Sequence, residues 1–358
     1  MKILQLTTWY SPRIGGVESH VKRLTEELEK LGCEIQIFTL TKTHEPLARS
    51  FRYLQIPSLP YGFGLLPSPS VFSETVKNDA DVIHCHAYGW PLAWTAALAK
   101  KKHGKPFVYT THADPYSKVY SLMDLTRAVP ARYCDRLIAL TKQEAEHMGR
   151  IGIPSSRISV IPNGFDSPNP GSKPIDEPYV LCIGRIEFRH KGQDLLLAAY
   201  RKTRVSQNLV FVGDGPDLAR LKTLSRGMPN VRIVGAVDEQ DKGRWMSNAE
   251  LVVVPSRTEP FGIVALEALS LNRRLVVTRV GGLQHVAGPF ATMVDPNPTD
   301  IARGLLDALH GPLPIIPKDF AEHYSWERVA GNVLEIYRSL TESKAPAVRH
   351  APSSQIEP

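Results

Sequence analysis

Short apolar runs alternate with segments of helical periodicity along most of the chain, and this alternation limits the possible folds more than any other feature. The expected strands of the first half are 2–7, 34–40, 82–86, 107–111, 136–140 and 158–161. The segments 16–31, 91–102 and 142–148 between them carry apolar residues at helical spacing. Strands that alternate with helices are typical of βαβ units. The sequence therefore predicts an α/β fold with parallel sheets.

The same rhythm starts again after a Pro-, Gly- and Asn-rich stretch at 163–174, which is typical of an interdomain linker. The expected strands of the second half are 179–184, 209–213, 231–234, 251–254, 275–278 and 291–294. A single hydrophobic core seldom exceeds about 250–300 residues, so a chain of 358 residues predicts two domains. We expect Rossmann-like domains at 1–165 and 166–325, a closing helix at 326–343 that returns to the first domain, and a disordered tail at 344–358.

Composition and charge narrow the class of protein further. No apolar run approaches the roughly 18–20 residues of a transmembrane helix, and the short apolar start at 2–7 reads as a strand instead of a signal peptide. Four scattered cysteines lie beside apolar residues and predict reduced core thiols in a cytoplasmic protein: Cys33, Cys85, Cys134 and Cys182. Residues 1–165 hold 20 Lys and Arg against 14 Asp and Glu, whereas 166–358 hold 23 against 22. The basic first half suggests either an anionic partner or a solvated surface.

Polar residues of the first half gather where strands are expected to end. Gly15 and Gly16 precede a helix, so they permit either close approach of an anion or a plain tight turn. His84 and His86 end one strand and His112 ends the next, which favours a functional position over a purely structural one. We expect no metal site there, because no Cys or carboxylate stands at ligand spacing and no third fixed ligand is evident.

Two motifs are expected to carry no chemistry. Asp79 and Asp81 resemble a D-x-D metal pattern but precede a strand, at the amino end of the sheet. The segment from Gly213 to Pro216 resembles a phosphate loop, but a strand-to-helix turn explains it, and we expect it only near the edge of a site.

The second half carries the stronger signals. Gly184 and Arg185 follow one strand, and Lys191 stands six residues after Arg185 on the same strand-to-helix connection. A planar guanidinium and a compact ammonium at the carboxyl end of a sheet suit the oxygens of a diphosphate. Two solvated loop cations are the alternative for this loop taken alone.

A pair of glutamates supports the diphosphate interpretation. Glu259 precedes a predicted helix and Glu267 lies within it, about 12 Å away at helical rise. Pro260 fits the first helical turn, and Gly262 exposes backbone amides to a phosphate. Glu267 is flanked by apolar residues, where a carboxylate needs partners such as vicinal ribose hydroxyls.

These segments resemble the retaining GT-B glycosyltransferases of glycosyltransferase family 4, from the first strand to about residue 340. The specific part is the Glu-x7-Glu pair with Arg185 and Lys191. Further matching motifs are Gly15-Gly16-Val17-Glu18, the strand from Asp81 to His86, the strand ending in His112, Asn163-Gly164, Gly281-Gly282 and Ser325-Trp326-Glu327. Asn272-Arg273-Arg274 departs from the usual Gly-Xaa-Pro turn, which affects only the shape of that loop.

The resemblance implies a GT-B fold that binds a nucleotide-sugar donor between its domains. It implies that Arg185 and Lys191 neutralise the leaving diphosphate, that Glu259 contacts the donor sugar, that Glu267 contacts the ribose and that His112 lies by the sugar. The other donor-binding positions implied are Gly15, Gly16, Asn163, Gly184, Phe261, Gly262 and Ile263. It implies retention of anomeric configuration, and no cofactor or metal, because the two cations supply the positive charge.

The acceptor is expected at the basic first domain, as a glycan or a lipid-linked molecule. An apolar loop at 61–72, with Lys100, Lys101, Lys102 and Lys105, suggests peripheral contact with an anionic membrane at its cytoplasmic face; packing of the loop on the core is the alternative.

The rival functions are a GT-B sugar-nucleotide epimerase, a phosphorylase and a non-catalytic GT-B subunit that binds a partner. A phosphorylase is expected to be far longer. An idle subunit is expected to have lost Arg185, Lys191 or Glu259, all of which are present. No nucleic-acid module is recognisable.

Overall fold

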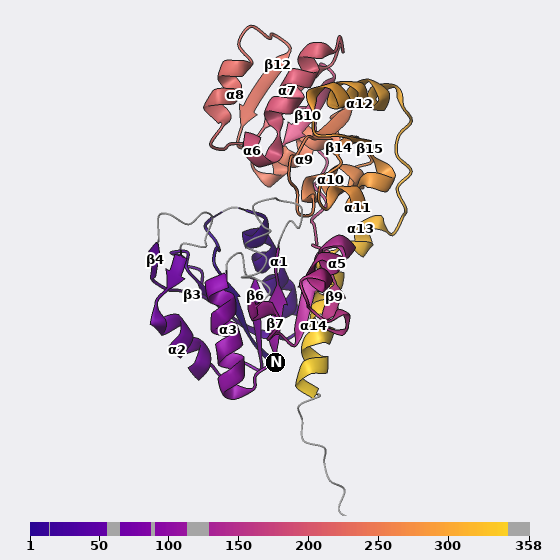
Figure 1. The fold of residues 1–358 in the computed structure, drawn as a ribbon. Helices are drawn as coiled ribbons and strands as arrows, with labels where there is room; N and C mark the ends of the chain where they lie inside the picture. The colour runs from indigo at the N-terminus through magenta and orange to yellow at the C-terminus, as the bar shows by residue number, and fades with distance from the viewer. Residues whose placement is uncertain (14, 56–64, 87–89, 113–128, 343–358) are drawn as a thin grey trace, which may run out of the picture.

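A computed structural model describes residues 1–13, 15–55, 65–86, 90–112 and 129–342, and it contains two parallel sheets in separate lobes (Figure 1). The first sheet has the order β3-β2-β1-β6-β7-β8-β9. Its strands are β1 (Lys2–Thr7), β2 (Glu34–Thr39), β3 (Ala48–Ser50), β6 (Val82–His86), β7 (Phe107–Thr110), β8 (Arg136–Ala139) and β9 (Ile158–Val160). Its helices are α1 (Gly16–Lys30), α2 (Pro69–Lys77), α3 (Trp90–His103), α5 (Lys142–Arg150) and the 3-10 turn η1 (Ser155–Arg157).

The second sheet has the order β12-β11-β10-β13-β14-β15. Its strands are β10 (Tyr179–Ile183), β11 (Asn208–Val212), β12 (Val231–Gly235), β13 (Leu251–Val254), β14 (Arg274–Thr278) and β15 (Thr292–Val294). The helices around it are α6 (Phe188–Lys191), α7 (Gln193–Lys202), α8 (Leu218–Leu224), α9 (Glu239–Ser247), α10 (Ile263–Ser270), α11 (Leu283–Val286), α12 (Pro298–His310) and α13 (Phe320–His323), with the 3-10 turn η2 (Gly288–Phe290). The prediction of an α/β fold with parallel sheets is confirmed.

The strands are apolar because helices cover both faces of each sheet. All four residues of β13 are buried, and the two faces of each sheet contribute to separate hydrophobic clusters. A strand buried on both faces loses the alternating pattern of a half-exposed strand, which is why continuous valine and leucine runs marked these elements. All four cysteines are buried and unpaired, as predicted.

Each sheet has one place where the strand order reverses. In the second sheet β10 lies between β11 and β13, so the connections that leave β10 and β13 run to opposite sides. Ligands of open α/β sheets bind outside the carboxyl ends of the strands at such a point. The reversal in the first sheet lies between β1 and β6, so the same rule selects the carboxyl ends of these two strands, and β7 is the next strand beyond β6.

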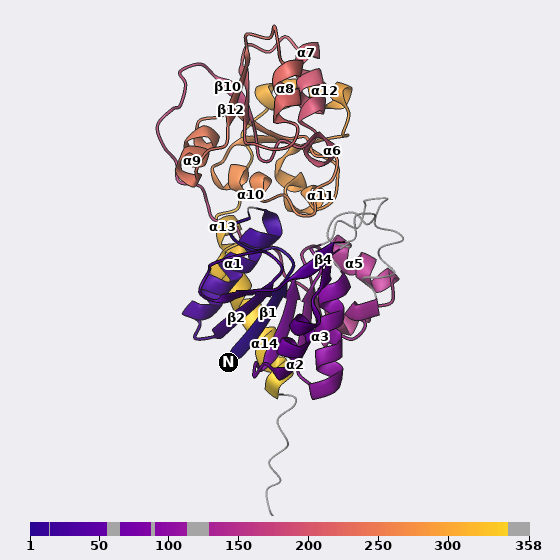
Figure 2. The same ribbon diagram turned by 90° about the vertical axis from the view of Figure 1, so that its left-hand side faces the viewer.

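The last helix returns to the first lobe. Helix α14 (Trp326–Glu342) packs against α1, far from the second sheet that precedes it in the chain (Figures 1 and 2). Trp326, Val333 and Tyr337 are buried in the same cluster as residues of α1 and β2. The predicted tail 344–358 lies outside the described residues.

One predicted loop is wrong in part. Within 61–72 the described residues form β5 (Leu65–Pro67), which pairs with β4 (Tyr53–Gln55), and the start of α2. Pro69 occupies the first turn of α2 and the side chain of Val71 is fully buried, so this part packs on the core. Residues 61–64 lie outside the described residues. Among the helices that the structure describes, none is both long and apolar enough to cross a bilayer.

Candidate active site

Hydrogen bonds, an ion pair and close packing join the loops that follow β10 and β13. The backbone N–H of Arg257 donates to the carbonyl oxygen of His190 at 2.7 Å. The Arg257 guanidinium donates to both carboxylate oxygens of Asp194, at 2.6 and 2.8 Å. Gly192 has a φ of 66°, and a Cβ there would overlap the carbonyl oxygen of Pro255. These contacts hold the two loops in one fixed arrangement at the reversal of the second sheet.

The predicted cations lie on the first of these loops. Gly184 ends β10 with a φ of 137°, and a Cβ on Gly213 would overlap its carbonyl oxygen, so the β11 turn approaches closely. The Arg185 side chain is 56% exposed, with the Glu187 carboxylate 3.7 Å from its Nε. Lys191 ends α6, and its Nζ lies 2.6 Å from Oε2 of Glu259. Arg185 is therefore accessible to a ligand, whereas Lys191 is joined to an acid of the second loop.

The second loop places Glu259 before the start of α10. Its carboxylate also accepts a hydrogen bond from the Ser256 hydroxyl at 3.3 Å, and its carbonyl oxygen accepts one from the N–H of Gly282 at 2.9 Å. Glu259 is 8% exposed and the Lys191 side chain 35% exposed, so the pair is partly shielded from water. Ion pairs shielded from water interact more strongly than those on an open surface.

The helix begins later than the sequence predicted. Helix α10 starts at Ile263, after Gly262 with a φ of 101°, so the placement of Pro260 in the first helical turn is wrong. Because the backbone of Gly262 is left-handed, the helix cannot extend toward the N-terminus past this residue. A Cβ at Gly262 would also meet the side chain of Leu283. The distance from Glu259 to Glu267 is therefore not a helical rise. The first N–H groups of α10 lack partners within the helix and can bind an anion.

Glu267 has a protein partner that the sequence did not reveal. It lies on the buried side of α10, and its Oε1 is 2.8 Å from Nζ of Lys242 on α9. Burial raises the pKa of the Glu267 carboxyl, and the Lys242 charge opposes this rise. Burial lowers the pKa of Lys242, but Glu267 and Glu239 more than offset this, so it is raised. The expectation that this carboxylate needs partners is met within the protein, because Lys242 pairs with it. Contact with ribose hydroxyls stays a prediction.

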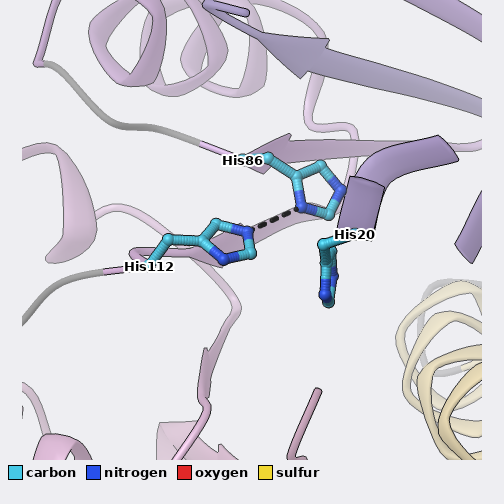
Figure 3. A group of neighbouring side chains, drawn as sticks. All are labelled: His20, His86 and His112. Carbon is cyan, nitrogen blue, oxygen red and sulfur yellow. Dashed lines mark hydrogen bonds between the residues drawn. The ribbon is translucent and has the colours of Figure 1, made fainter. Parts of the chain in front are cut away.

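The first lobe contributes a cluster of histidines. His86 Nδ1 and His112 Nε2, at the ends of β6 and β7, lie 3.3 Å apart, and His20 of α1 lies beside them (Figure 3). His112 has a φ of 51°, a conformation that costs about 1–3 kcal/mol in a non-glycine residue and is common at functional sites. Burial lowers the pKa of His20 to about 4 and the pKa values of His86 and His112 well below the usual range. The three rings are therefore neutral at pH 7.

The cluster corrects two predictions. His84 has a structural setting, because one ring nitrogen lies 2.6 Å from the Tyr337 hydroxyl and the other 2.8 Å from Oγ1 of Thr110. The statement that no third ligand is available was wrong, since His20 supplies one. His20 lies on the buried face of α1 with Val21, and this polar residue within an apolar stripe was the signal that could have revealed it.

The other residues predicted to bind the donor lie in both lobes. Asn163 is buried, with its Oδ1 2.7 Å from Nδ1 of His20. Gly15 precedes α1, and a Cβ there would overlap the Glu18 carboxylate, whereas a Cβ on Gly16 would meet nothing. Phe261 is buried in the core of the second lobe.

Two groups thus emerge. The first group lies around the reversal of the second sheet and consists of Gly184, Arg185, Lys191, Glu259, Gly262, Ile263 and Glu267. The second group consists of His112 and Asn163, which lie in the histidine cluster of the first lobe. In the part of the chain that the structure describes, no hydrogen bond or ion pair links His112 to Arg185, Lys191 or Glu259.

The two discounted motifs lie outside both groups or at their edge. The Asp79 carboxylate pairs with the Lys2 ammonium at 2.5 Å, and Asp81 accepts from the Lys2 backbone N–H at 2.8 Å, at the amino end of the first sheet. Gly213 contributes to the packing beneath Gly184.

Comparisons with known proteins identify the family of both halves of the chain. The sequence profile of Glycosyltransferase Family 4 matches residues 14–167, and that of Glycosyl transferases group 1 matches residues 166–324. D-inositol 3-phosphate glycosyltransferase 2 of Catenulispora acidiphila is 29% identical, over 95% of this chain and 94% of that protein. The phosphatidylinositol N-acetylglucosaminyltransferase subunit of Arabidopsis thaliana is 26% identical, over 94% of this chain and 81% of that protein.

Solved structures show the same fold. The HepE protein of Anabaena, crystallised with UDP and glucose, superimposes with a TM-score of 0.74 at 18% identity, over 95% of this chain and 100% of that one. Together the two profiles extend from residue 14 to residue 324, across both lobes. The chain therefore belongs to the GT-B glycosyltransferases, with a family 4 first half and a group 1 second half.

Proposed function

We propose that this glycosyltransferase transfers a sugar from a UDP- or GDP-sugar to a saccharide or lipid-linked acceptor, with retention of anomeric configuration and without a metal ion. The observation that carries the proposal is the Lys191–Glu259 ion pair, which lies just before α10, with an accessible Arg185 on the same loop as Lys191. This arrangement sets two cations and a helix N-terminus beside an acid, and suits a phosphorylated sugar.

The donor diphosphate is proposed to lie against Arg185, Lys191 and the first amides of α10. Negative charge grows on the leaving diphosphate as the glycosidic bond breaks, so fixed cations there stabilise the transition state more than the ground state. Lys191 is held by Glu259 before the donor binds and is proposed to turn toward the diphosphate when the donor arrives.

Glu259 then becomes available to accept hydrogen bonds from the hydroxyls of the donor sugar. Glu267 is proposed to accept from the ribose hydroxyls while Lys242 keeps it ionised. His112, Gly15 and Gly16 belong to the first lobe and are proposed to meet the sugar and diphosphate when the lobes close. Attack of the acceptor on the same face that the diphosphate leaves, through an oxocarbenium-like state, accounts for retention.

The choice of substrates draws on relatives. HepE was crystallised with UDP and glucose, which favours a UDP-sugar as the first donor to try. The Arabidopsis relative is named for transfer to phosphatidylinositol, and the Catenulispora relative for D-inositol 3-phosphate. An inositol-containing acceptor, free or lipid-linked, is therefore the first class to test.

Contact with an anionic membrane is proposed only for the lipid-linked case. Lys101 and Lys102 are exposed at the end of α3, whereas Lys100 pairs with Asp135 at 2.8 Å and Lys105 bonds to the carbonyl oxygen of Asn78. Sedimentation with anionic vesicles at low salt is expected to carry the protein down. Protein that stays in solution would remove this part of the proposal.

The test is a transfer assay with UDP-glucose, UDP-N-acetylglucosamine and GDP-mannose against inositol acceptors, in buffer with EDTA. Wild-type protein is expected to form a glycoside with the donor's anomeric configuration by NMR. Lys191→Met is expected to lower the rate at least about 100-fold, because one transition-state donor is typically worth this much. The control is Lys222→Met, which removes an exposed ammonium from α8 and should leave the rate unchanged.

Three results would contradict the proposal. They are a Lys191→Met rate equal to that of Lys222→Met, an inverted product, or activity that is seen only when EDTA is left out of the buffer. Conversion of the donor to an isomeric nucleotide sugar without acceptor would instead favour the epimerase alternative.

A further inference from the structure

The histidine cluster has the composition of a metal site. His20, His86 and His112 each offer one ring nitrogen, and these three atoms all lie within 4.8 Å of one another (Figure 3). Their side chains come from α1 and from the ends of β6 and β7, so the sheet and a helix packed on it fix their positions. All three are buried: His86 is fully inaccessible, and His20 and His112 are 4% and 5% exposed.

One nitrogen of the cluster lacks a partner. Nε2 of His86 is buried and makes no hydrogen bond within the described part of the chain. His84, the neighbouring ring on the same strand, differs in this respect, because both of its nitrogens are bonded to hydroxyls. A buried polar atom without a partner is uncommon, and it shows that hydrogen bonds fix the His86 ring less completely than the His84 ring.

The setting of His20 resembles that of a metal ligand. Its Nδ1 lies 2.7 Å from the side-chain oxygen of Asn163, so Nδ1 carries the proton and donates to that oxygen. The lone pair is then on Nε2. Histidines that bind metals nearly always donate their other ring N–H to an oxygen, which fixes the tautomer and the direction of the ring.

We propose that His20, His86 and His112 form a binding site for a divalent transition-metal ion of the Zn²⁺ class, with three imidazole ligands and one open position. Imidazole suits Zn²⁺ and its neighbours, whereas Ca²⁺ and Mg²⁺ require oxygen ligands that the cluster does not offer. Zn–N bonds of about 2.0–2.1 Å in a tetrahedron separate two nitrogens by roughly 3.4 Å. The 3.3 Å between His86 and His112 already matches this spacing, and small ring rotations bring in His20.

The ion would inhibit transfer. Binding engages a nitrogen of His112, which the proposed function places beside the donor sugar, and it fixes the ring away from that role. This consequence rests on the proposed function, whereas metal binding itself does not. Inhibition by a bound ion is consistent with the metal-independent transfer proposed above, because the enzyme without metal is then the active form.

The test is calorimetric titration of Zn²⁺ into the full-length protein, freed of affinity tag and treated with EDTA. We expect about one ion per chain, and at least a tenfold loss of affinity in His20→Gln, because loss of even an outer-shell partner typically costs 10–100-fold. His84→Gln is the matched control, since it removes an equally buried ring that lies next to His86 but outside the cluster, and it should retain the ion. His103→Gln controls for exposed histidines. No stoichiometric binding, or equal affinity in His20→Gln, would overturn the site.

A measurement on wild-type protein covers the case in which a variant does not fold. X-ray absorption at the zinc edge of the equimolar complex is expected to show three imidazole ligands and one further light atom. One imidazole or none, or a sulfur ligand, would overturn the proposal. Added Zn²⁺ is further expected to slow transfer and EDTA to restore it. Because binding is read without any donor or acceptor, failure of the metal site and failure of the glycosyltransferase assignment give different results.

Discussion

At the scale of single residues, Glu267 shows how a buried carboxylate is stabilised by an ion pair. It is 5% exposed, and an isolated carboxylate there would favour its protonated form. Lys242 supplies the opposing charge at 2.8 Å, and Glu239 in turn pairs with the same ammonium at 2.5 Å. The ion pair thus holds in place the acid that is proposed to bind the donor ribose.

Lys242→Met is expected to make donor binding more sensitive to acid. Burial already raises the pKa of Glu267, and removing Lys242 raises it further, so the carboxylate that is proposed to accept from ribose protonates at a higher pH. As the pH is lowered, the donor KM should therefore begin to rise at a higher pH in the variant than in wild type. Lys242→Arg should restore the wild-type profile. A KM raised equally at every pH would indicate a structural role instead.

His20 and Lys242 escaped prediction for a physical reason. Each lies on a helix whose contact with the site depends on how that helix packs. The apolar stripe of α1 could mark His20 as buried, but no local spacing records which residues it meets. Lys191 and Glu259 are also 68 residues apart, yet both follow strands, and strand ends meet at one edge of a sheet. Lys191 and Glu259 could be placed near each other from the sequence because the strand order brings their two loops together.

At the scale of elements, the strands were the most predictable parts. β1, β6 and β13 have the predicted bounds, because runs buried on both faces end where the polar loops begin. The start of α10 was misplaced because Pro260 is compatible with a first turn, while the left-handed backbone of Gly262 follows from contacts with a distant segment at Leu283. α2 was missed because its Pro and Ser residues read as a loop.

Gly192→Ala tests the junction of the two site loops. Its φ of 66° disfavours alanine, and the new Cβ would overlap the backbone of Pro255, which cannot move aside. The free energy of unfolding is expected to fall by about 2 kcal/mol or more, with weaker donor binding because Lys191 precedes it. Gly104→Ala is the control, since its φ is 65° but its Cβ would meet nothing. Equal losses in chemical denaturation would show that the overlap has no effect.

At the scale of the whole molecule, the chain crosses between the lobes twice. The segment after β9 leads out to the second lobe, where the N–H of Phe165 donates to the carbonyl oxygen of Tyr324 at 3.0 Å, and α14 leads back. Arg23 of α1 also bonds to Asp166 at 2.8 Å. The α/β fold could be predicted from its rhythm. The interlobe contacts could not, because they join residues far apart in sequence.

Trp326→Ala tests the return crossing. The ring is 5% exposed, packs in the core of the first lobe and lies 5.4 Å from the ring of His20. Loss of a buried tryptophan leaves a cavity, so the free energy of unfolding is expected to fall by about 3–5 kcal/mol in chemical denaturation. Ile315→Ala, which truncates a 91% exposed side chain, should change it by less than about 0.5 kcal/mol. A similar effect in both variants would mean that α14 does not depend on this anchor.

Binding of a donor diphosphate at the carboxyl ends of β10 and β13 underlies the proposed function. A crystal structure of the protein with UDP or GDP would show the ligand itself. Phosphate oxygens are expected against Arg185, Lys191 and the first amides of α10, with ribose hydroxyls on Glu267 and the Lys191–Glu259 bond broken. A diphosphate bound at any other place, with that ion pair intact, would contradict it.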